Sequence, residues 1–230
     1  MLTVRGLSIS IEKAQILRRV GLHIPKGATA GLIGRNGAGK TTLMRGIMGL
    51  IPRDEGEIVF DGQDLTRIPA HRRAHLRIGY MPEDRRLVPE FTVEENILLP
   101  VWATRQAADA RRVDWVYEMM PEIAQFRDRK ALSLSGGQQK LVALGRAMIC
   151  GSKLLLLDEP FEGVAPALAQ RLQEVIDNLK GAGLSVLISE SDYTHTVDLL
   201  DHLFVIERGA LEERVVQAGE TGKVQKGERP

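Results

Sequence analysis

The segment 34–41 has the residue types and the spacing of a phosphate-binding loop. It consists of Gly34, Arg35, Asn36, Gly37, Ala38, Gly39, Lys40 and Thr41, and it fits the pattern G-x-x-x-x-G-K-[ST] throughout. Glycines let the backbone turn tightly, so that successive N–H groups can face a phosphate. Lys40 adds a mobile cation for the β- and γ-phosphates, and the Thr41 hydroxyl is placed to ligate Mg²⁺. The segment therefore predicts a site for a nucleoside triphosphate and magnesium.

Two acidic residues, Asp158 and Glu159, follow an apolar run of leucines over 154–157. Such a run is typical of a buried strand, and ligands of open α/β sheets bind at the carboxyl ends of the strands. Asp158 would hold Mg²⁺, directly or through water. Glu159 is then the candidate general base that polarises an attacking water. Acidic residues can also simply end a strand, and it is the phosphate-loop pattern that favours the catalytic interpretation.

A third motif narrows the choice among kinases, GTPases, helicases and transport ATPases. It is the segment 134–138, Leu-Ser-Gly-Gly-Gln, which precedes a predicted helix over 138–150. Ser135, Gly136 and Gly137 can offer a hydroxyl and backbone N–H groups to a phosphate at a helix N-terminus. Because this second phosphate-binding element lies far from the first in the sequence, it favours a dimer in which each chain completes the other's site.

Short apolar runs alternate with helical patterns along most of the chain. The predicted strands cover 2–4, 7–11, 17–24, 28–33, 57–60, 78–81, 154–157, 184–189 and 203–206. The predicted helices cover 41–50, 93–98, 105–120, 138–150 and 166–180. This alternation predicts an α/β fold with a mainly parallel sheet covered on both faces, and the helices between residues 90 and 147 predict a helical insertion.

The composition is that of an ordinary globular protein without a strong charge bias. The chain has 230 residues, which at about 150 residues per domain predicts one large domain, and its formal net charge is +1. That balance gives no electrostatic reason to bind nucleic acid. Cys150 is the one cysteine, which excludes an internal disulfide. No window approaches the ~18 apolar residues of a membrane span and no signal peptide is recognisable, so we expect work in the cytoplasm unless a partner brings the chain to a membrane.

Taken in order, these motifs together with Glu83 resemble the ATP-binding cassette (ABC) ATPase family over residues 2–215. Within that family the chain is most similar to the ATPase subunits of branched-chain amino acid importers, on the segments 33–42, 81–86, 91–96 and 162–166. The resemblance implies a P-loop NTPase of the ABC ATPase fold, with a mainly parallel core sheet and an antiparallel β subdomain. It also implies one domain over 1–230 with a helical subdomain at about 84–147. The polar, glycine-containing end of the chain predicts a mobile tail at 218–230.

The resemblance further implies a head-to-tail dimer with two ATP molecules at its interface. Each ATP would be sandwiched between Gly34–Thr42 of one chain and Ser135–Gln138 of the other. Thr42 and Gln138 would both contact the nucleotide. Mg²⁺ would be surrounded by Thr41, Glu83 and Asp158. Lys40 and Glu159 would carry the hydrolysis. The implied role is ATP hydrolysis that powers import of a small molecule, namely branched-chain amino acids or a related polar or organic compound.

The partners that the resemblance implies follow from this role. They are a second ABC ATPase chain, identical or a sister subunit, and transmembrane permease subunits that the helical insertion would contact. An extracytoplasmic solute-binding protein would act indirectly, and no nucleic acid is expected. The chain would lie peripherally on the cytoplasmic face of the inner or plasma membrane.

Two positions depart from the family pattern. Ile11 stands where the family usually has an aromatic residue that stacks on adenine, so apolar contact remains but ring stacking is lost. Ser191 stands at the switch position, which the family usually fills with histidine or, in the branched-chain type, glutamine. A serine would reach a γ-phosphate only through water or after local movement, so we expect slow hydrolysis or two unequal sites. His195 could substitute if its segment is helical, and an exposed histidine on a helix is the alternative.

Other interpretations stay open. An ATP-binding regulatory or partner cassette with weak hydrolysis is favoured by Ser191 and opposed by Glu159. A non-transport cytosolic cassette acting on ribosomes or DNA would usually have a second cassette or a long coiled coil in the insertion. An unrelated P-loop kinase or GTPase would leave Leu134–Gln138 without a role. Amides, urea-like compounds and aromatic acids are alternatives for the transported substrate.

Overall fold

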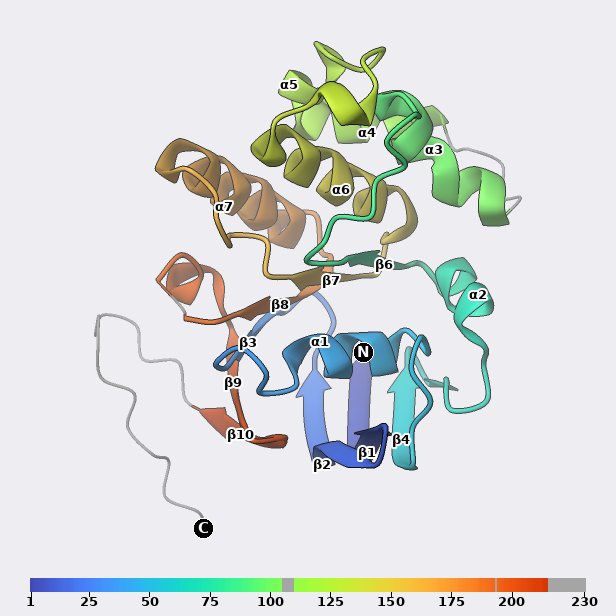
Figure 1. Cartoon of the computed structure of the whole chain (residues 1–230), viewed down its shortest axis with the longest axis vertical. Coiled ribbons are helices and arrows are strands. Elements are labelled where there is room, and N and C mark those ends of the chain that lie inside the picture. The colour runs from blue at the N-terminus through green and yellow to red at the C-terminus, as the bar shows by residue number, and fades with distance from the viewer. Residues whose placement is uncertain (105–109, 193, 215–230) are drawn as a thin grey trace.

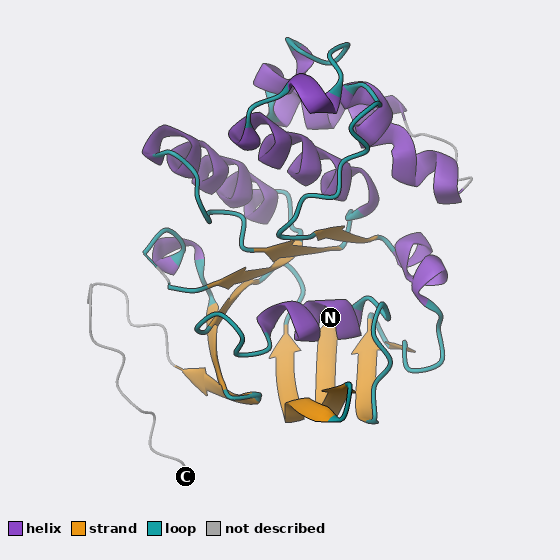
Figure 2. Ribbon diagram, viewed as in Figure 1, coloured by secondary structure: helices purple, strands orange, loops and turns teal. Residues whose placement is uncertain are grey.

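Two sheets flank one central helix in this protein (Figures 1 and 2). The structure is a computed structural model that describes residues 1–104, 110–192 and 194–214, so the predicted tail at 218–230 lies outside it. The larger sheet has the strand order β10-β9-β3-β8-β7-β6, and the smaller one has the order β2-β1-β4-β5. The larger sheet is parallel except for β10, whereas the smaller one is antiparallel.

The elements have the following bounds. The strands are β1 (Leu2–Ile11), β2 (Ala14–Ile24), β3 (Thr29–Ile33), β4 (Glu55–Phe60), β5 (Gln63–Asp64), β6 (Ile78–Met81), β7 (Leu154–Asp158), β8 (Ser185–Glu190), β9 (His202–Glu207) and β10 (Ala210–Arg214). The helices are α1 (Lys40–Ile47), α2 (Ala70–Arg73), α3 (Val93–Thr104), α4 (Ala110–Met119), α5 (Pro121–Ala124), α6 (Gly136–Cys150) and α7 (Pro166–Gly181). Short 3₁₀ turns cover Ala74–Leu76, Ala131–Ser133 and Val197–Leu199.

Strand β7 is buried on both faces, which explains its uninterrupted run of leucines. Leu154 and Leu156 belong to the apolar cluster that contains α1 and the smaller sheet. Leu155 and Leu157 belong to the cluster that contains α6 and α7. Because successive side chains of a strand point to opposite faces, an apolar residue is needed at every position.

Helix α1 lies between the two sheets (Figure 1) and sets the position of the loop that precedes it. Its residues Leu43, Met44 and Ile47 are fully buried in the same cluster as the inner faces of β1 and β2. Burial of a large aliphatic side chain contributes about 1.5–3 kcal/mol, so this face anchors the helix firmly. The N-terminus of α1 is thereby fixed at the carboxyl end of β3.

Helices α3 to α6 form a lobe on the face of the larger sheet away from α1 (Figure 1). The loop into this lobe is fixed by the start of α3. Glu95 Oε2 accepts from the Thr92 N–H at 2.7 Å, and the Thr92 hydroxyl accepts from the Glu95 N–H at 3.1 Å, which is a capping box. The fully buried Asn96 accepts from the Val88 N–H at 2.8 Å and donates to the Val88 carbonyl at 3.0 Å. These bonds fix the loop at Val88, five residues after Glu83.

The predicted α/β class and the mainly parallel sheet are confirmed. The two strands predicted over 2–4 and 7–11 form one strand, β1, with register shifts around Gly6, whose φ is 57°. The helix predicted over 138–150 begins earlier, at Gly136. The helix predicted over 105–120 is described from Ala110 to Met119, and residues 105–109 lie outside the described ranges. Helix α2 has no predicted counterpart, because four residues are too few to show helical periodicity.

The sequence contains no apolar window long enough to predict a membrane-spanning helix. Across the part of the chain that the structure describes, each helix is too short or too polar to cross a bilayer.

Candidate functional site

The phosphate-loop segment lies at the carboxyl end of β3 and ends where α1 begins. Gly39 is the N-cap of α1 with φ of 114°, a conformation that favours glycine, and a Cβ atom there would stand 2.8 Å from Leu17 Cδ2. Gly37 has φ of 80° and faces open space. The loop residues 35–37 are exposed. The first N–H groups of α1 and the positive end of its dipole therefore face an accessible loop, which is a suitable place for an anion.

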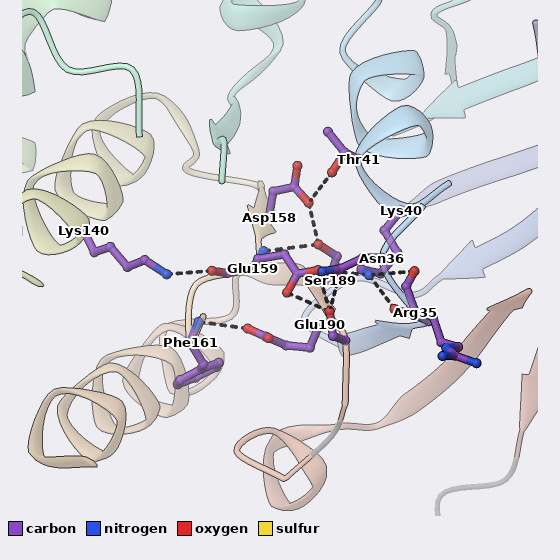
Figure 3. A network of polar contacts seen from close by, with 12 residues as sticks. Arg35, Asn36, Lys40, Thr41, Lys140, Asp158, Glu159, Phe161, Ser189 and Glu190 are labelled. Atoms are coloured by element: carbon purple, nitrogen blue, oxygen red, sulfur yellow. Dashed lines mark hydrogen bonds and ion pairs between the residues drawn. The ribbon is translucent and has the colours of Figure 1, made fainter. Parts of the chain in front are cut away.

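The Lys40 side chain is almost fully buried, and its ammonium group contacts Glu159 (Figure 3). Nζ lies 2.9 Å from Glu159 Oε1, and the two side chains are 4% and 6% exposed. Nζ also donates to the carbonyl of Gly34 and, at 3.4 Å, to that of Arg35. Buried charges persist when they are paired and hydrogen-bonded, so each of these two groups stabilises the other here.

Asp158 is fully buried and is held by three hydroxyl groups. Its Oδ1 accepts from Ser189 Oγ at 2.6 Å and from Thr41 Oγ1 at 3.2 Å (Figure 3). Its Oδ2 accepts from the Tyr80 hydroxyl at 3.2 Å. Burial raises the pKa of Asp158, these hydrogen bonds lower it, and the neighbouring Glu159 raises it further. The carboxylate is therefore oriented by strands β6 and β8 on either side of β7.

Of the predicted magnesium set Thr41, Glu83 and Asp158, the structure joins Thr41 Oγ1 to Asp158 Oδ1 at 3.2 Å. Glu83 is exposed two residues after β6. Partial loss of solvent around its carboxyl group, followed by the charges of Glu162, Asp158 and Glu159, raises its pKa. No three His, Cys, Asp or Glu side chains enclose a metal ion by themselves within the described residues. Mg²⁺ typically takes one or two carboxylates and completes its shell with phosphates and water. The donors fit Mg²⁺ that arrives with a triphosphate.

Ser191, directly after β8, contacts both the phosphate loop and the acidic pair. Its hydroxyl lies 2.8 Å from Asn36 Oδ1 and 3.1 Å from Glu159 Oε1. A hydroxyl has a single proton, so at any moment it donates to one of these oxygens. The switch position thus lies beside the Lys40–Glu159 pair, and the short serine side chain is long enough to reach both Asn36 and Glu159.

The segment around His195 is not helical, so the condition on which His195 could substitute for Ser191 is not met. Residues 194–196 form a turn that precedes the 3₁₀ turn Val197–Leu199. The imidazole stacks on the ring of Phe161 with the centroids 5.7 Å apart, and the His195 carbonyl accepts from Gln173 Nε2 at 2.6 Å. The alternative of an exposed histidine is right about exposure and wrong about the helix, because His195 is exposed but lies in a turn that places its ring on Phe161.

The segment 134–138 lies at the start of α6, where Ser135 is the N-cap. Ser135 Oγ accepts from the Gln138 N–H at 3.3 Å, and Gln138 Oε1 accepts from the Ser135 N–H at 3.0 Å. Ser135 and Gly136 are exposed. Within the described ranges, no hydrogen bond joins this segment to the phosphate loop. The N-terminus of α6 therefore presents its N–H groups outward from the chain.

A hollow of about 540 Å³ adjoins the phosphate loop. It is lined by loop residues 34–38 and by residues 205–208 at the end of β9. Ile11, at the end of β1, is 40% exposed and does not line this hollow. The role of Ile11 as an adenine contact stays a prediction.

Four functional side chains were not singled out from the sequence. They are Tyr80, Lys140, Ser189 and Glu190. A signal existed for Tyr80 and Ser189, because β6 and β8 flank β7 and residues at the carboxyl ends of adjacent strands meet. The sequence held no signal for Lys140, because its contacts depend on how α6 packs against the loop after β7. Glu190 looked like an ordinary strand end.

Comparison with known protein families matches residues 17–162 to the family described as ABC transporter. Since that range is more than half of the chain, the chain belongs to the ABC transporter family. It is an ATPase cassette, a P-loop fold with the two sheets and the helical lobe described above.

Two curated relatives are similar over most of their length. The lipopolysaccharide export system ATP-binding protein LptB of Haemophilus influenzae is 33% identical over 213 residues, which cover 92% of this chain and 88% of that protein. The high-affinity branched-chain amino acid transport ATP-binding protein BraG of Pseudomonas aeruginosa is 34% identical over 211 residues, which cover 92% of this chain and 91% of that protein.

Solved structures share the same fold. The ADP conformation of MJ1267, an ATP-binding cassette of an ABC transporter, matches with a TM-score of 0.80 and 30% identity over 92% of this chain and 89% of that chain. The dimeric structure of MJ0796, a bacterial ABC transporter cassette, matches with a TM-score of 0.85 and 22% identity over 95% of this chain and 100% of that chain.

Proposed function

We propose that this chain is the subunit of an ABC transporter that binds and hydrolyses ATP with the residues described above. The contact between Lys40 and Glu159 carries the proposal. It joins the cation expected to bind phosphate to the carboxylate expected to activate water. The whole chain, 1–230, acts as one cassette whose helical subdomain covers about 84–147.

The chemistry begins when a triphosphate enters the loop. Backbone N–H groups of the loop and the α1 N-terminus bind its oxygens, and Lys40 transfers from Glu159 to the β- and γ-phosphates. This transfer leaves Glu159 as a buried carboxylate without its cation. It can then accept the proton of the attacking water, which gives ADP and phosphate.

Bound Mg²⁺ would neutralise charge on the phosphate oxygens. Thr41 and Asp158 would hold it, and Glu83 would contact it directly or through a water. Ser189 and Tyr80 keep the Asp158 carboxylate oriented toward Thr41.

The site is completed by a second cassette chain in a head-to-tail dimer. Ser135–Gln138 of the second chain would bind the γ-phosphate that Gly34–Thr42 of the first chain holds. The outward-facing N-terminus of α6 supports this arrangement, because such a terminus stabilises negative charge and, in the described part of the chain, makes no hydrogen bond to the phosphate loop.

The dimer would work with transmembrane permease subunits at the cytoplasmic face of the membrane. For the cargo we propose a branched-chain amino acid or a related small compound, delivered by a solute-binding protein; the similarity to BraG supports this. Export of a lipid is the second candidate, which the similarity to LptB favours. Radiolabelled leucine uptake in cells lacking this chain separates the two. Lost uptake supports import, whereas normal uptake with altered lipopolysaccharide supports export.

The hydrolysis proposal is tested by Mg²⁺-dependent ATP turnover of the purified chain across a concentration series, with Glu159→Gln as the comparison. A rate that rises more than linearly with protein and is lost in Glu159→Gln supports a dimeric catalytic cassette. Full activity of Glu159→Gln would contradict it. Tight ATP binding without turnover at any concentration would favour the alternative of a regulatory partner cassette.

A further inference from the structure

Glu159 has a backbone conformation that its surroundings must hold. Its φ is 50°, in the left-handed region that residues other than glycine rarely adopt. Such residues persist where neighbours over-determine them, and they gather at active sites. One side is fixed by β8, because the Glu159 N–H donates to the Ser189 carbonyl at 3.1 Å and to Ser189 Oγ at 3.2 Å.

Lys140 of α6 fixes the other side of Glu159 (Figure 3). Its Nζ donates to the carbonyl of Glu159 at 2.9 Å, to that of Pro160 at 3.2 Å and also to that of Glu162. Lys140 is 7% exposed. An ammonium group has three protons, and these three carbonyls use all of them. The N–H groups of this buried ammonium therefore all donate to the backbone of one loop.

Lys140 is held in place despite its burial. Burial lowers the pKa of Lys140, and the neighbouring acidic groups Glu190 and Glu162 oppose that effect only in part. Glu190, itself 7% exposed, accepts from the Phe161 N–H at 2.9 Å. The loop 159–162 is therefore held by Lys140 from α6 and by Glu190 from β8.

Lys140 also connects this loop to the segment 134–138. It lies little more than one turn from Ser135, the N-cap of the same helix. Because hydrogen bonds make α6 stiff over this distance, a displacement of its N-terminus moves Lys140 Nζ and the carbonyls that it holds. The two halves of the proposed composite site are linked within each chain by this one side chain.

We propose that Lys140 is a positioning residue of the ATPase reaction, which holds Glu159 in the conformation from which its carboxylate reaches Lys40 and couples that conformation to the helix beginning at Ser135. The inference rests on the proposed role of Glu159. Lys140 acts through the backbone and does not itself contact phosphate.

The test compares Lys140→Met, Lys140→Arg and Lys180→Met, the last being a matched loss of a lysine whose ion pair with Asp201 lies at the surface. Turnover, KM for ATP and the affinity for a fluorescent ATP analogue are measured for each variant, alone and combined with Glu159→Gln. We expect Lys140→Met to lower kcat about 10- to 100-fold, since small misplacements of a reacting group have effects of this size. Nucleotide affinity should stay unchanged, Lys140→Arg should restore part of kcat, and Lys180→Met should match the wild type.

The combination with Glu159→Gln separates positioning from general destabilisation. If Lys140 acts through Glu159, Lys140→Met lowers the residual rate of Glu159→Gln no further. Equal losses in both backgrounds, or a Lys140→Met protein with full kcat, would overturn the inference while the role of Glu159 stands. Full activity of Glu159→Gln alone would overturn the proposed function and this inference with it. If Lys140→Met does not fold, an Lys140→Arg variant with kcat and affinity lowered together indicates a structural role only.

Discussion

The phosphate loop and the segment 134–138 are both glycine-containing helix N-termini, but they differ in what they contact. The loop before α1 meets buried groups of its own chain, with Lys40 on Glu159 and Thr41 on Asp158. The Ser135 segment is exposed and its polar groups mainly cap their own helix. The difference teaches that parallel-sheet topology brings the residues of the first proposed phosphate site together within one chain. On the proposed function, the second would need a partner chain to become a site.

The largest expected effect comes from a substitution in the phosphate loop, whose side chains contact buried groups. Lys40→Met removes the cation expected to contact the phosphates, and we expect turnover to fall by about 100-fold or more. Steady-state ATPase measurement checks this, with Lys180→Met as the surface control. A Lys40→Met protein that turns over ATP within a factor of about two of the wild type would mean that the loop does not bind the reacting phosphates.

The same contrast explains what the sequence could predict. The phosphate loop, Asp158 and Glu159 were predictable because local pattern and strand ends place them, and sheet register brings Ser189 opposite Asp158. The ion pair between Lys40 and Glu159 was not, because it depends on how a buried side chain extends across the site. Lys140 and the stacking of His195 on Phe161 depend on how α6 and the turn at 194–196 pack, which no short-range pattern encodes.

A second prediction concerns Ser191, which contacts Glu159 beside the phosphate loop. Histidine at this position offers a longer side chain and a proton donor near the γ-phosphate, so Ser191→His should raise kcat by about tenfold. Single-turnover kinetics check the change, and Ser191→Ala, which loses the contact with Asn36, serves as the comparison. Equal rates for Ser191→His and the wild type would refute the expectation of slow hydrolysis.

A third prediction concerns nucleotide affinity rather than chemistry. Ile11→Tyr would supply the missing ring for adenine, and a gain of about 1 kcal/mol corresponds to roughly fivefold tighter ATP binding. Isothermal titration calorimetry of ATP measures it. Because Ile11 does not line the hollow beside the loop, unchanged affinity would show that adenine binds away from β1.

The smallest effect is expected at Glu190, between the two regions. Burial, with a further contribution from Glu159 and Asp192 against Lys140 and the Phe161 N–H, raises the pKa of Glu190 from 4.5 to about 8. The folded chain therefore keeps a proton that the unfolded chain loses, so this carboxyl lowers stability as pH rises from 4.5 toward 8 and has no further effect above it.

Glu190→Gln keeps the acceptor for the Phe161 N–H but removes this titration. The thermal unfolding midpoint of the variant should fall less between pH 5 and pH 8 than that of the wild type, by a few degrees. Differential scanning calorimetry at the two pH values decides the matter. Parallel changes in both proteins would mean that Glu190 is ionised in the folded state.

The central claim, that each phosphate site is shared between chains, is tested most directly by mixing two inactive variants. Lys40→Met disables the loop, and Ser135→Arg disables the outward-facing helix N-terminus without touching the loop. In an equal mixture about half of the dimers are mixed and each has one intact site, so about a quarter of the wild-type ATPase rate should return. A mixture that stays as inactive as either variant alone, although native mass spectrometry shows mixed dimers, would contradict the shared site.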